Sequence, residues 1–379
     1  MALNWIDLTA FFAFLAFVIG VSLYAGRGEE TGEDYFLAGR GLTWPLIGLS
    51  LIASNISTEQ IVGMAGGGVA TAGLAIASYE WVAAVALVVV ALFLLPVFLR
   101  LGIYTMPEFL EHRYGPAPRT LMAAYMIMAY VAVLLVSVLY SGAVLFEGLI
   151  GLDLYASIWP IGLIAGGYTI YGGLKAVVWS DLIQGLALIL GGLIVTSLAL
   201  SEIGGVGAFL DANADKLHMM LPADHPEIPW TAMLIGIWIP NLYYWGLNQF
   251  ITQRTLGAKS LHEGQKGVIF AAFLKLLMPF IIVVPGIIAF QLYPEQIARS
   301  GDDAFPVLMS NLLPGWGLRG VLFAALFGAV MTRSTQCSTR ARPSSPSTST
   351  SATCARRRIG TASWWWAGSR RASLCCSPA

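Results

Sequence analysis

The chain has 379 residues, of which 57 % are hydrophobic and 11 % are charged, and its mean hydropathy is +0.73. A soluble domain carries about 25 % charged residues, so this composition excludes a water-soluble protein and indicates an integral membrane protein. The four cysteines all lie beyond residue 331, which excludes disulfides from the preceding part of the chain.

Stretches without Asp, Glu, Lys or Arg repeatedly reach the roughly 20 residues that a helix needs to cross a bilayer. The apolar pattern predicts nine helices, at about residues 6–25, 42–66, 74–99, 118–149, 154–172, 176–200, 231–250, 263–293 and 317–331. The first lacks the basic start and cleavage site of a secretory signal, so we expect it to be retained as a helix.

The charges of the predicted loops indicate which side of the membrane each loop faces. With the N-terminus outside, nine Lys and Arg, Arg254 among them, fall in cytoplasmic loops and three fall in external ones. Cytoplasmic loops carry an excess of Lys and Arg, so we expect a multi-pass protein of the cell membrane with an external N-terminus. The acidic loop at 201–230 would then be an external cap.

The second predicted helix places six polar residues between positions 54 and 60, directly before the glycine-rich run 63–68. Such polarity inside a span is costly and must face protein or a wet cavity, and the glycines indicate a broken helix whose free carbonyls could bind a cation. A close-packed helix interface would explain the glycines but not Glu59 and Gln60.

Lone charges occur in two other spans, at Glu80 and Lys275, and each is by default a candidate functional residue. A purely structural buried ion pair is the alternative. The seventh helix adds amide and aromatic side chains such as Asn241 and Tyr244, which suit a sugar or, alternatively, an interfacial aromatic belt. The four histidines are dispersed and no nucleophile with a base stands out, so an enzyme is not expected.

At this point the chain resembles the sodium/solute symporters, and within them the bacterial sodium/galactose branch. The similarity covers about residue 5 to Met331 and rests on six segments. These are SLIASNISTEQIVGMAG (50–66), GLAIASYEW (73–81), GIYTMPEFLEHRYG (102–115), YGGLKAVVWSDLIQ (171–184), NLYYWGLNQFITQRTLGAKS (241–260) and QKGVIFAAFLKLLMPF (265–280).

The resemblance implies an all-α polytopic membrane protein with the leucine-transporter-like inverted-repeat architecture and a midplane site. Residues 1–331 would form the transmembrane symporter domain, with an extra helix at 6–25. The first repeat would run from about 42 to 200, and a partial, truncated second repeat from about 231 to 331.

The resemblance also implies roles for individual residues. Sugar hydroxyls would be bound by Gln60, Glu80, Asn241 and Lys275. Tyr244 would stack under the sugar ring as an inner gate held by Asn55. Sodium would be bound by the carbonyl groups of Ala53 and Ile56 and, on the last span, by Ala329 and Thr332. Asp181 matches an acidic position on the sodium exit route. A sugar-contact serine of relatives is replaced by Ala83 here, which leaves the identity of the sugar open.

The implied function is sodium-coupled transport of a galactose-like or glucose-like sugar by alternating access, with the sodium ion, the sugar and the lipid bilayer as partners. A symporter of inositol, sialic acid, proline or pantothenate is one alternative. A non-transporting sensor or scaffold, whose basic tail contacts anionic lipid or a partner, is the other.

The character of the chain changes at residue 332. Residues 332–379 contain eight Arg, eleven Ser and seven Thr but no Asp, Glu or Lys, and they lack apolar periodicity. Their composition is typical of a disordered basic tail. A frameshift is the alternative, because codons permitted for residues 332–351, when read from two bases later, encode a family-like sequence. We favour the frameshift, and therefore expect this chain to transport little. Sequencing the coding DNA tests the frameshift.

Overall fold

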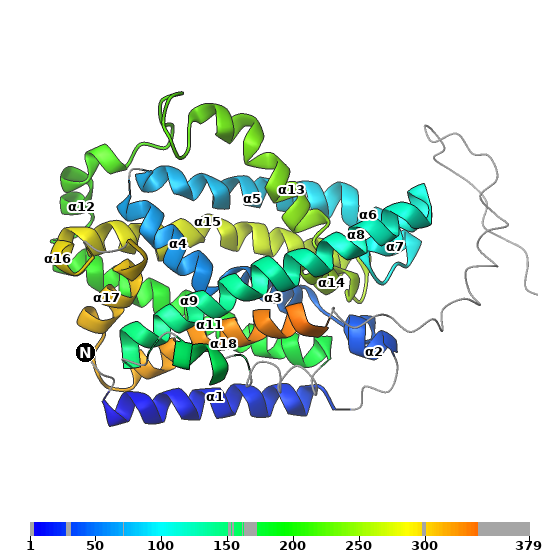
Figure 1. Ribbon diagram of the computed structural model, residues 1–379, viewed down its shortest axis with the longest axis horizontal. Coiled ribbons are helices and arrows are strands. Elements are labelled where there is room, and N and C mark those ends of the chain that lie inside the picture. Colours follow the sequence, from blue (N-terminus) through cyan, green and yellow to red (C-terminus); the bar gives the residue numbers. More distant parts are fainter. Residues whose placement is uncertain are drawn as a thin grey trace, which may run out of the picture. The chain divides into compact units, whose positions relative to one another are not determined.

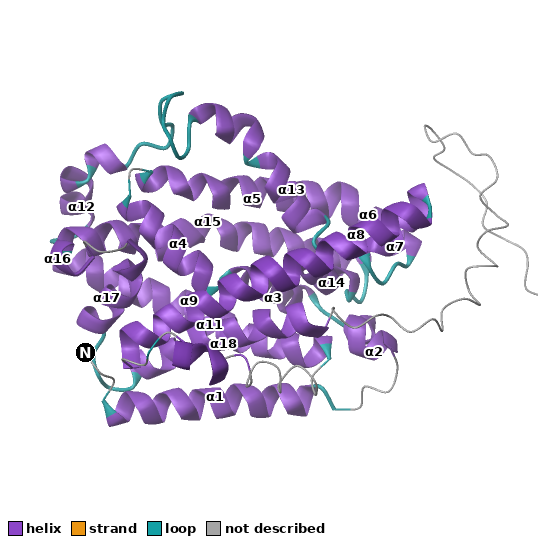
Figure 2. Cartoon of the chain, in the orientation of Figure 1, coloured by secondary structure: helices purple, strands orange, loops and turns teal. Residues whose placement is uncertain are grey.

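The computed structural model describes residues 4–27, 32–70, 72–150, 153, 155–160, 162, 173–297 and 301–339. Within these residues it contains helices and no strand (Figure 2). The first half comprises α1 (Trp5–Ala25), α2 (Gly32–Leu37), α3 (Trp44–Asn55), α4 (Thr58–Val69), α5 (Ser78–Val89), α6 (Leu95–Leu101), α7 (Met106–Tyr114), α8 (Pro116–Met128) and α9 (Leu135–Ile150). The second comprises α11 (Leu174–Glu202), α12 (Val206–Ala212), α13 (Trp238–Gly246), α14 (Gln249–Leu256), α15 (Leu261–Leu292), α16 (Pro294–Ile297), α17 (Ala304–Leu312) and α18 (Leu318–Thr339).

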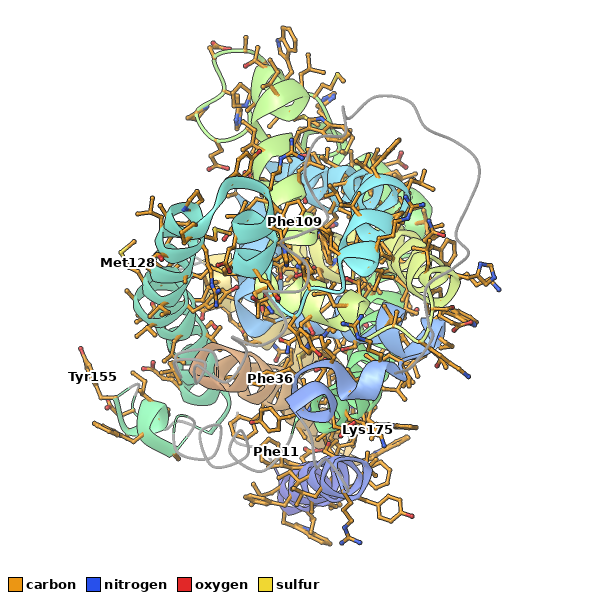
Figure 3. All side chains as sticks on the ribbon, turned by 90° about the vertical axis from the view of Figure 1, so that its right-hand side faces the viewer. Phe11, Phe36, Phe109, Met128, Tyr155 and Lys175 are labelled. Carbon is orange, nitrogen blue, oxygen red and sulfur yellow. The ribbon has the colours of Figure 1, made fainter. Side chains whose placement is uncertain are left out.

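Among the residues that the structure describes, five helices are long and apolar enough to cross a bilayer. They cover Trp5–Ala25, Gly73–Leu101, Pro116–Ala143, Leu174–Glu202 and Leu261–Leu292. Many large apolar side chains on them point outward, as Figure 3 shows for Met128 of α8, whereas Phe11 lies between α1 and the bundle. An apolar exterior around buried charged groups is the arrangement expected in lipid.

Most predicted helices are found close to their expected positions. The spans predicted at 6–25, 74–99, 118–149, 176–200 and 263–293 each coincide with an observed helix or with helices joined through a π-helical stretch. The predicted helix at 154–172 lies mostly outside the described residues.

The bundle is organised around α3, α11 and α15, which pack closely because small residues line their contacts (Figure 1). Gly185 of α11 faces Ala53 of α3, where an added Cβ would lie 2.8 Å from the alanine Cβ. Gly286 of α15 similarly faces the backbone of Ala65 in α4. Backbones that approach this closely exclude larger side chains, so the glycines fix how the two halves of the second span sit against α11 and α15.

The span predicted at 42–66 is broken, as its polar and glycine-rich sequence indicated. Ile56 and Ser57 are extended, and the helix restarts at Thr58 with the Ser57 hydroxyl accepting from the Gln60 amide at 3.4 Å. A serine in this conformation is a good N-cap, so it starts a helix and does not continue one. The break therefore lies between the end of α3 at Asn55 and the start of α4 at Thr58.

The helix predicted at 231–250 is also interrupted, and this prediction of a single helix was wrong. A π-helical stretch at Ala232–Gly236 precedes α13, and α14 begins after an extended Asn248 and continues to Leu256. The Asn248 side chain accepts from the Phe250 amide at 3.3 Å and from the Tyr130 hydroxyl at 2.7 Å. Asn248 therefore caps a new helix. It is held in place by Tyr130, which lies in the π-helical stretch between α8 and α9.

The predicted end of the last helix at Met331 was wrong as well, because α18 continues to Thr339. Residues 332–342 contain neither proline nor glycine, and Pro343 is the first residue that must break a helix. Polar residues of modest helix propensity extend an existing helix readily once it is nucleated.

A strap formed by residues 203–230 includes α12 and covers the ends of α4 and α15, at the end of the bundle where α16 and α17 lie (Figure 1). Lys216 Nζ donates to the carbonyl oxygen of Val69, at the end of α4, at 2.9 Å and lies 4.3 Å from the ring centroid of Phe290 on α15. The Asn213 amide donates to Gln291 Oε1 at 3.1 Å. Burial lowers the pKa of Lys216, and the neighbouring Asp215 opposes that shift.

We expect Lys216→Met to loosen this strap, because it removes a charged donor from a helix C-terminus and a cation from an aromatic face. The two contacts together contribute about 1–3 kcal/mol. Limited proteolysis within 203–230 should accelerate by about tenfold or more, whereas Lys259→Met, at an exposed lysine, should leave the rate unchanged. Equal rates for the two variants would show that Lys216 does not hold the strap.

Candidate functional site

A cluster of buried polar side chains lies at the break between α3 and α4. It consists of Asn55 from the end of α3, Gln60 from the start of α4, Glu80 of α5, Tyr244 of α13 and Lys275 of α15. Glu80 and Lys275 are 4 % and 1 % exposed and form an ion pair. An unpaired charge in this environment would be very costly, so the two lone charges of the sequence satisfy each other.

Gln60 and Asn55 extend the ion pair into a network. The Gln60 side-chain amide donates to Glu80 Oε1 at 2.6 Å, while the other Glu80 oxygen accepts from the Lys275 ammonium. Lys275 also donates to Asn55 Oδ1, and Asn55 Nδ2 donates to the Tyr244 hydroxyl at 3.2 Å. The cluster therefore links both halves of the broken second span to three other helices.

Aromatic rings form one wall of the cluster. Tyr244 contacts Trp245 and Phe250 edge to face, with ring centroids 5.1 and 5.5 Å apart, and the Trp245 ring centroid lies 5.2 Å from Lys275 Nζ. A flat apolar face next to amide and charged groups can stack on one surface of a ring-shaped solute and hydrogen-bond to its rim.

One acceptor of the cluster has no partner among the described residues: Gln60 Oε1, which is buried. A buried acceptor left without a donor costs about 1–3 kcal/mol. An O–H donor placed beside the carbonyl end of Gln60 would remove that cost, so this position favours a hydroxyl-bearing solute.

Asn241 lies one turn before Tyr244 on α13, but its side-chain amide donates to the Ile237 carbonyl at 3.0 Å, within its own segment. In the described structure no hydrogen bond joins Asn241 to the cluster. Its sugar-binding role stays a prediction, as do the roles of the other four sugar-site residues and of Asn55 as the partner of the Tyr244 gate.

The helix break frees backbone carbonyls where the resemblance placed sodium. Because Ile56 and Ser57 are extended, the last carbonyls of α3, including that of Ala53, have no further turn above them to donate hydrogen bonds. Ala329 is buried on α18, which contacts α3. The Thr332 side chain lies outside the described residues. The sodium site as a set also stays a prediction.

A second buried ion pair joins Asp181 of α11 to Arg254 of α14. Both side chains are at most 1 % exposed, and Arg254 NH2 donates to Asp181 Oδ2 at 2.7 Å. The hydropathy pattern predicted a cytoplasmic loop at Arg254, and this prediction was wrong, because Arg254 lies in α14. Every residue of α14 is buried, so a charge in that helix requires a buried partner.

The fold and the buried polar cluster together define a multi-span membrane protein with a hydrogen-bonded polar cluster among its helices. A profile of the sodium:solute symporter family matches residues 35–341. The chain belongs to the sodium:solute symporter family. The resemblance stated from the sequence motifs is thereby confirmed.

The chain is similar to a sodium/glucose cotransporter of Vibrio parahaemolyticus, with 45 % identity over 359 residues, covering 87 % of this chain and 66 % of that protein. It is 38 % identical to an uncharacterized symporter of Escherichia coli K12, covering 87 % of this chain and 60 % of the relative. The chain thus spans slightly less than two thirds of the length of these relatives.

A solved structure of a Na⁺-coupled sialic acid symporter in a substrate-bound outward-open state matches with a TM-score of 0.80 at 22 % identity. The match covers 88 % of this chain and 71 % of that one. At this identity the similarity concerns the fold, and it confirms the predicted all-α, leucine-transporter-like architecture.

Proposed function

We propose that the chain belongs to a system for sodium-coupled symport of a galactose-like or glucose-like sugar across the cell membrane, with transport impaired by the change of sequence at residue 332. The observation that carries this proposal is the buried cluster of Asn55, Gln60, Glu80, Tyr244 and Lys275 at the helix break. It combines hydrogen-bonding groups of both kinds with an aromatic wall, which is what a pyranose with an apolar face and a hydroxyl rim requires.

The charge balance of the described interior supports an uncharged solute. Lys275 is neutralised by Glu80, and Arg254 by Asp181, so neither buried cation is left over for a solute carboxylate. Sialic acid and pantothenate each carry a net negative charge that would need such a cation, because a buried charge without a counter-charge is strongly disfavoured. Glucose, galactose and the alternative inositol are neutral.

In this proposal sodium binds at the free carbonyls of Ala53 and Ile56, together with Ala329 and Thr332 of α18, and leaves past Asp181. Occupancy would hold α3 against α18 and so stabilise the arrangement that binds sugar. The membrane potential contributes about 2.3 kcal/mol per elementary charge for each 100 mV, which drives the inward step.

The proposed orientation has the N-terminus outside. It is supported by the placement of the N-terminus, α12, α16 and α17 at one end of the bundle and of α2, α7 and α14 at the other (Figure 1). In Figure 3 the basic residue Lys175 lies at the end that faces the viewer, the proposed cytoplasmic end.

Binding of a labelled sugar to the purified chain tests the proposal. We expect labelled galactose or glucose to bind in NaCl, and Gln60→Ala to weaken binding at least tenfold, because it removes both the Glu80 contact and the vacant acceptor. Asn241→Ala should weaken binding as well, because the proposed sugar site includes this side chain. Thr120→Ala on α8 is the control, because Thr120 is exposed and its hydroxyl donates to the Pro116 carbonyl within its own helix. Binding that is unaffected by Gln60→Ala would argue against this site.

A further inference from the structure

Arg254 makes an unusually complete set of contacts for an arginine inside a helical bundle. Its Nε donates to Ser50 Oγ at 2.6 Å, its NH2 donates to Asp181 Oδ2 at 2.7 Å, and its NH1 donates to the Phe250 carbonyl one turn earlier in α14. These contacts fix the guanidinium between α3, α11 and α14. The side chain is fully buried.

The groups around the guanidinium form a small cluster of oxygen atoms. Asp181 Oδ2 accepts from Ser50 Oγ at 2.5 Å and from Ser54 Oγ at 3.1 Å. One carboxylate and two hydroxyl oxygens are ligands of the kind that a hard cation such as sodium prefers. In the described structure, this set of oxygens has the guanidinium as its counter-cation.

The oxygen cluster of Ser50, Ser54 and Asp181 lies next to the helix break. Ser54 directly follows Ala53, and Gly185, one turn after Asp181 on α11, packs against the Ala53 side chain. A cation that leaves the free carbonyls of α3 on the side of α14 would therefore meet this cluster next. That step rests on the proposed function.

The helix that carries Arg254 is separate from the one before it. The extended Asn248 divides α13 from α14, so α14 can rotate about that point without unwinding α13. Its attachment to α3 and α11 depends on the arginine contacts described above, together with apolar packing.

We propose that Arg254 is a tethered cation that occupies the oxygen cluster of Ser50, Ser54 and Asp181 in place of sodium. Docking of α14 and binding of sodium at Asp181 are then mutually exclusive, because two cations cannot share one buried carboxylate. Arg254 acts as a positioning residue: it displaces sodium from Asp181 as α14 docks, and sodium at Asp181 keeps α14 undocked.

The test is chemical rescue of Arg254→Gln by sodium. The purified chain, Arg254→Gln and the charge-balanced double variant Asp181→Asn/Arg254→Gln are unfolded thermally in NaCl and in choline chloride of equal ionic strength. We expect the Tm of Arg254→Gln to be at least about 3 °C higher in NaCl, and to rise further with NaCl concentration, because sodium binds the vacated carboxylate. Choline is too large to enter.

The original chain should show a smaller sodium effect, and the double variant should show none beyond it. Arg119→Gln, at an exposed ion pair with Glu111, provides the matched control for loss of an arginine. Equal Tm values of Arg254→Gln in the two salts, failure of that variant to fold in either salt, or an undiminished sodium effect in the double variant would each contradict the proposal. Sugar binding, measured separately, reports on the proposed function independently of this result.

Discussion

Lys275→Met is expected to destabilise the protein by about 3–5 kcal/mol, because it leaves the Glu80 carboxylate buried without its counter-charge. The methionine fills a similar volume, so the loss comes from charge and not from a cavity. The change also removes the donor to Asn55 Oδ1 and thereby frees the residue that positions Tyr244. We expect a large drop in Tm in detergent, or loss of folded material, and no measurable sugar binding.

The double variant Glu80→Gln/Lys275→Met separates stability from function. It removes both charges, and replacing a buried ion pair by neutral groups is often close to neutral for stability, so most of the lost Tm should return. Sugar binding should stay absent, because the solute loses two hydrogen-bonding partners. If the double variant is as unstable as Lys275→Met, the ion pair is not the origin of the loss. If it binds sugar normally, the cluster is not the site.

Part of the candidate site was predictable from the sequence, because polar and charged residues are rare within membrane spans. Glu80 and Lys275 were singled out because each interrupts an apolar span, and Gln60 because it follows a polar run before glycines. Their pairing was not predictable, since the two charges are 195 positions apart and meet only when α5 packs on α15. The purely structural interpretation of such a pair, left open by the sequence, is what the double variant tests.

Other features were missed because local sequence patterns do not reveal them. Arg254 has neighbours of low hydropathy and follows a predicted helix, so hydropathy assigned it to a loop, whereas tertiary packing buries all of α14. The helix interruption at Asn248 depends on an asparagine cap whose significance appears only once Tyr130 contacts it. Thr332–Thr339 continue α18 although their composition indicated a change in the character of the chain.

The packing of α1 against α18 was also not predictable, because it depends on how closely the backbones of the two helices approach each other. The Asn4 side-chain amide donates to the Gly315 carbonyl at 2.7 Å, and the Gly317 amide donates to Asp7 Oδ1 at 3.0 Å. A carboxylate from α1 therefore caps the start of α18, which is favourable at the positive end of a helix. Gly320 lies one turn further on, directly against the Asp7 carbonyl.

Gly320→Ala is expected to separate α1 from α18. A Cβ at this position would overlap the carbonyl oxygen of Asp7, a backbone atom that cannot yield unless one helix moves. Overpacking of this kind costs about 1–3 kcal/mol or more, and a shift of α18 would also break the Gly317 amide's bond to Asp7. We expect a fall in Tm of several degrees and a reduced yield of folded protein.

Gly20→Ala is the matched control, because Gly20 lies on α1 with no atom within 4 Å of the added Cβ. Alanine is favoured over glycine in a helix by about 0.8–1.0 kcal/mol, so this variant should be at least as stable as the original chain. The two substitutions add the same methyl group and differ in the room available. If Gly320→Ala unfolds at the same temperature as Gly20→Ala, α1 does not approach α18 this closely. If it unfolds earlier, α1 is held against α18 by the close approach of the Asp7 carbonyl to Gly320.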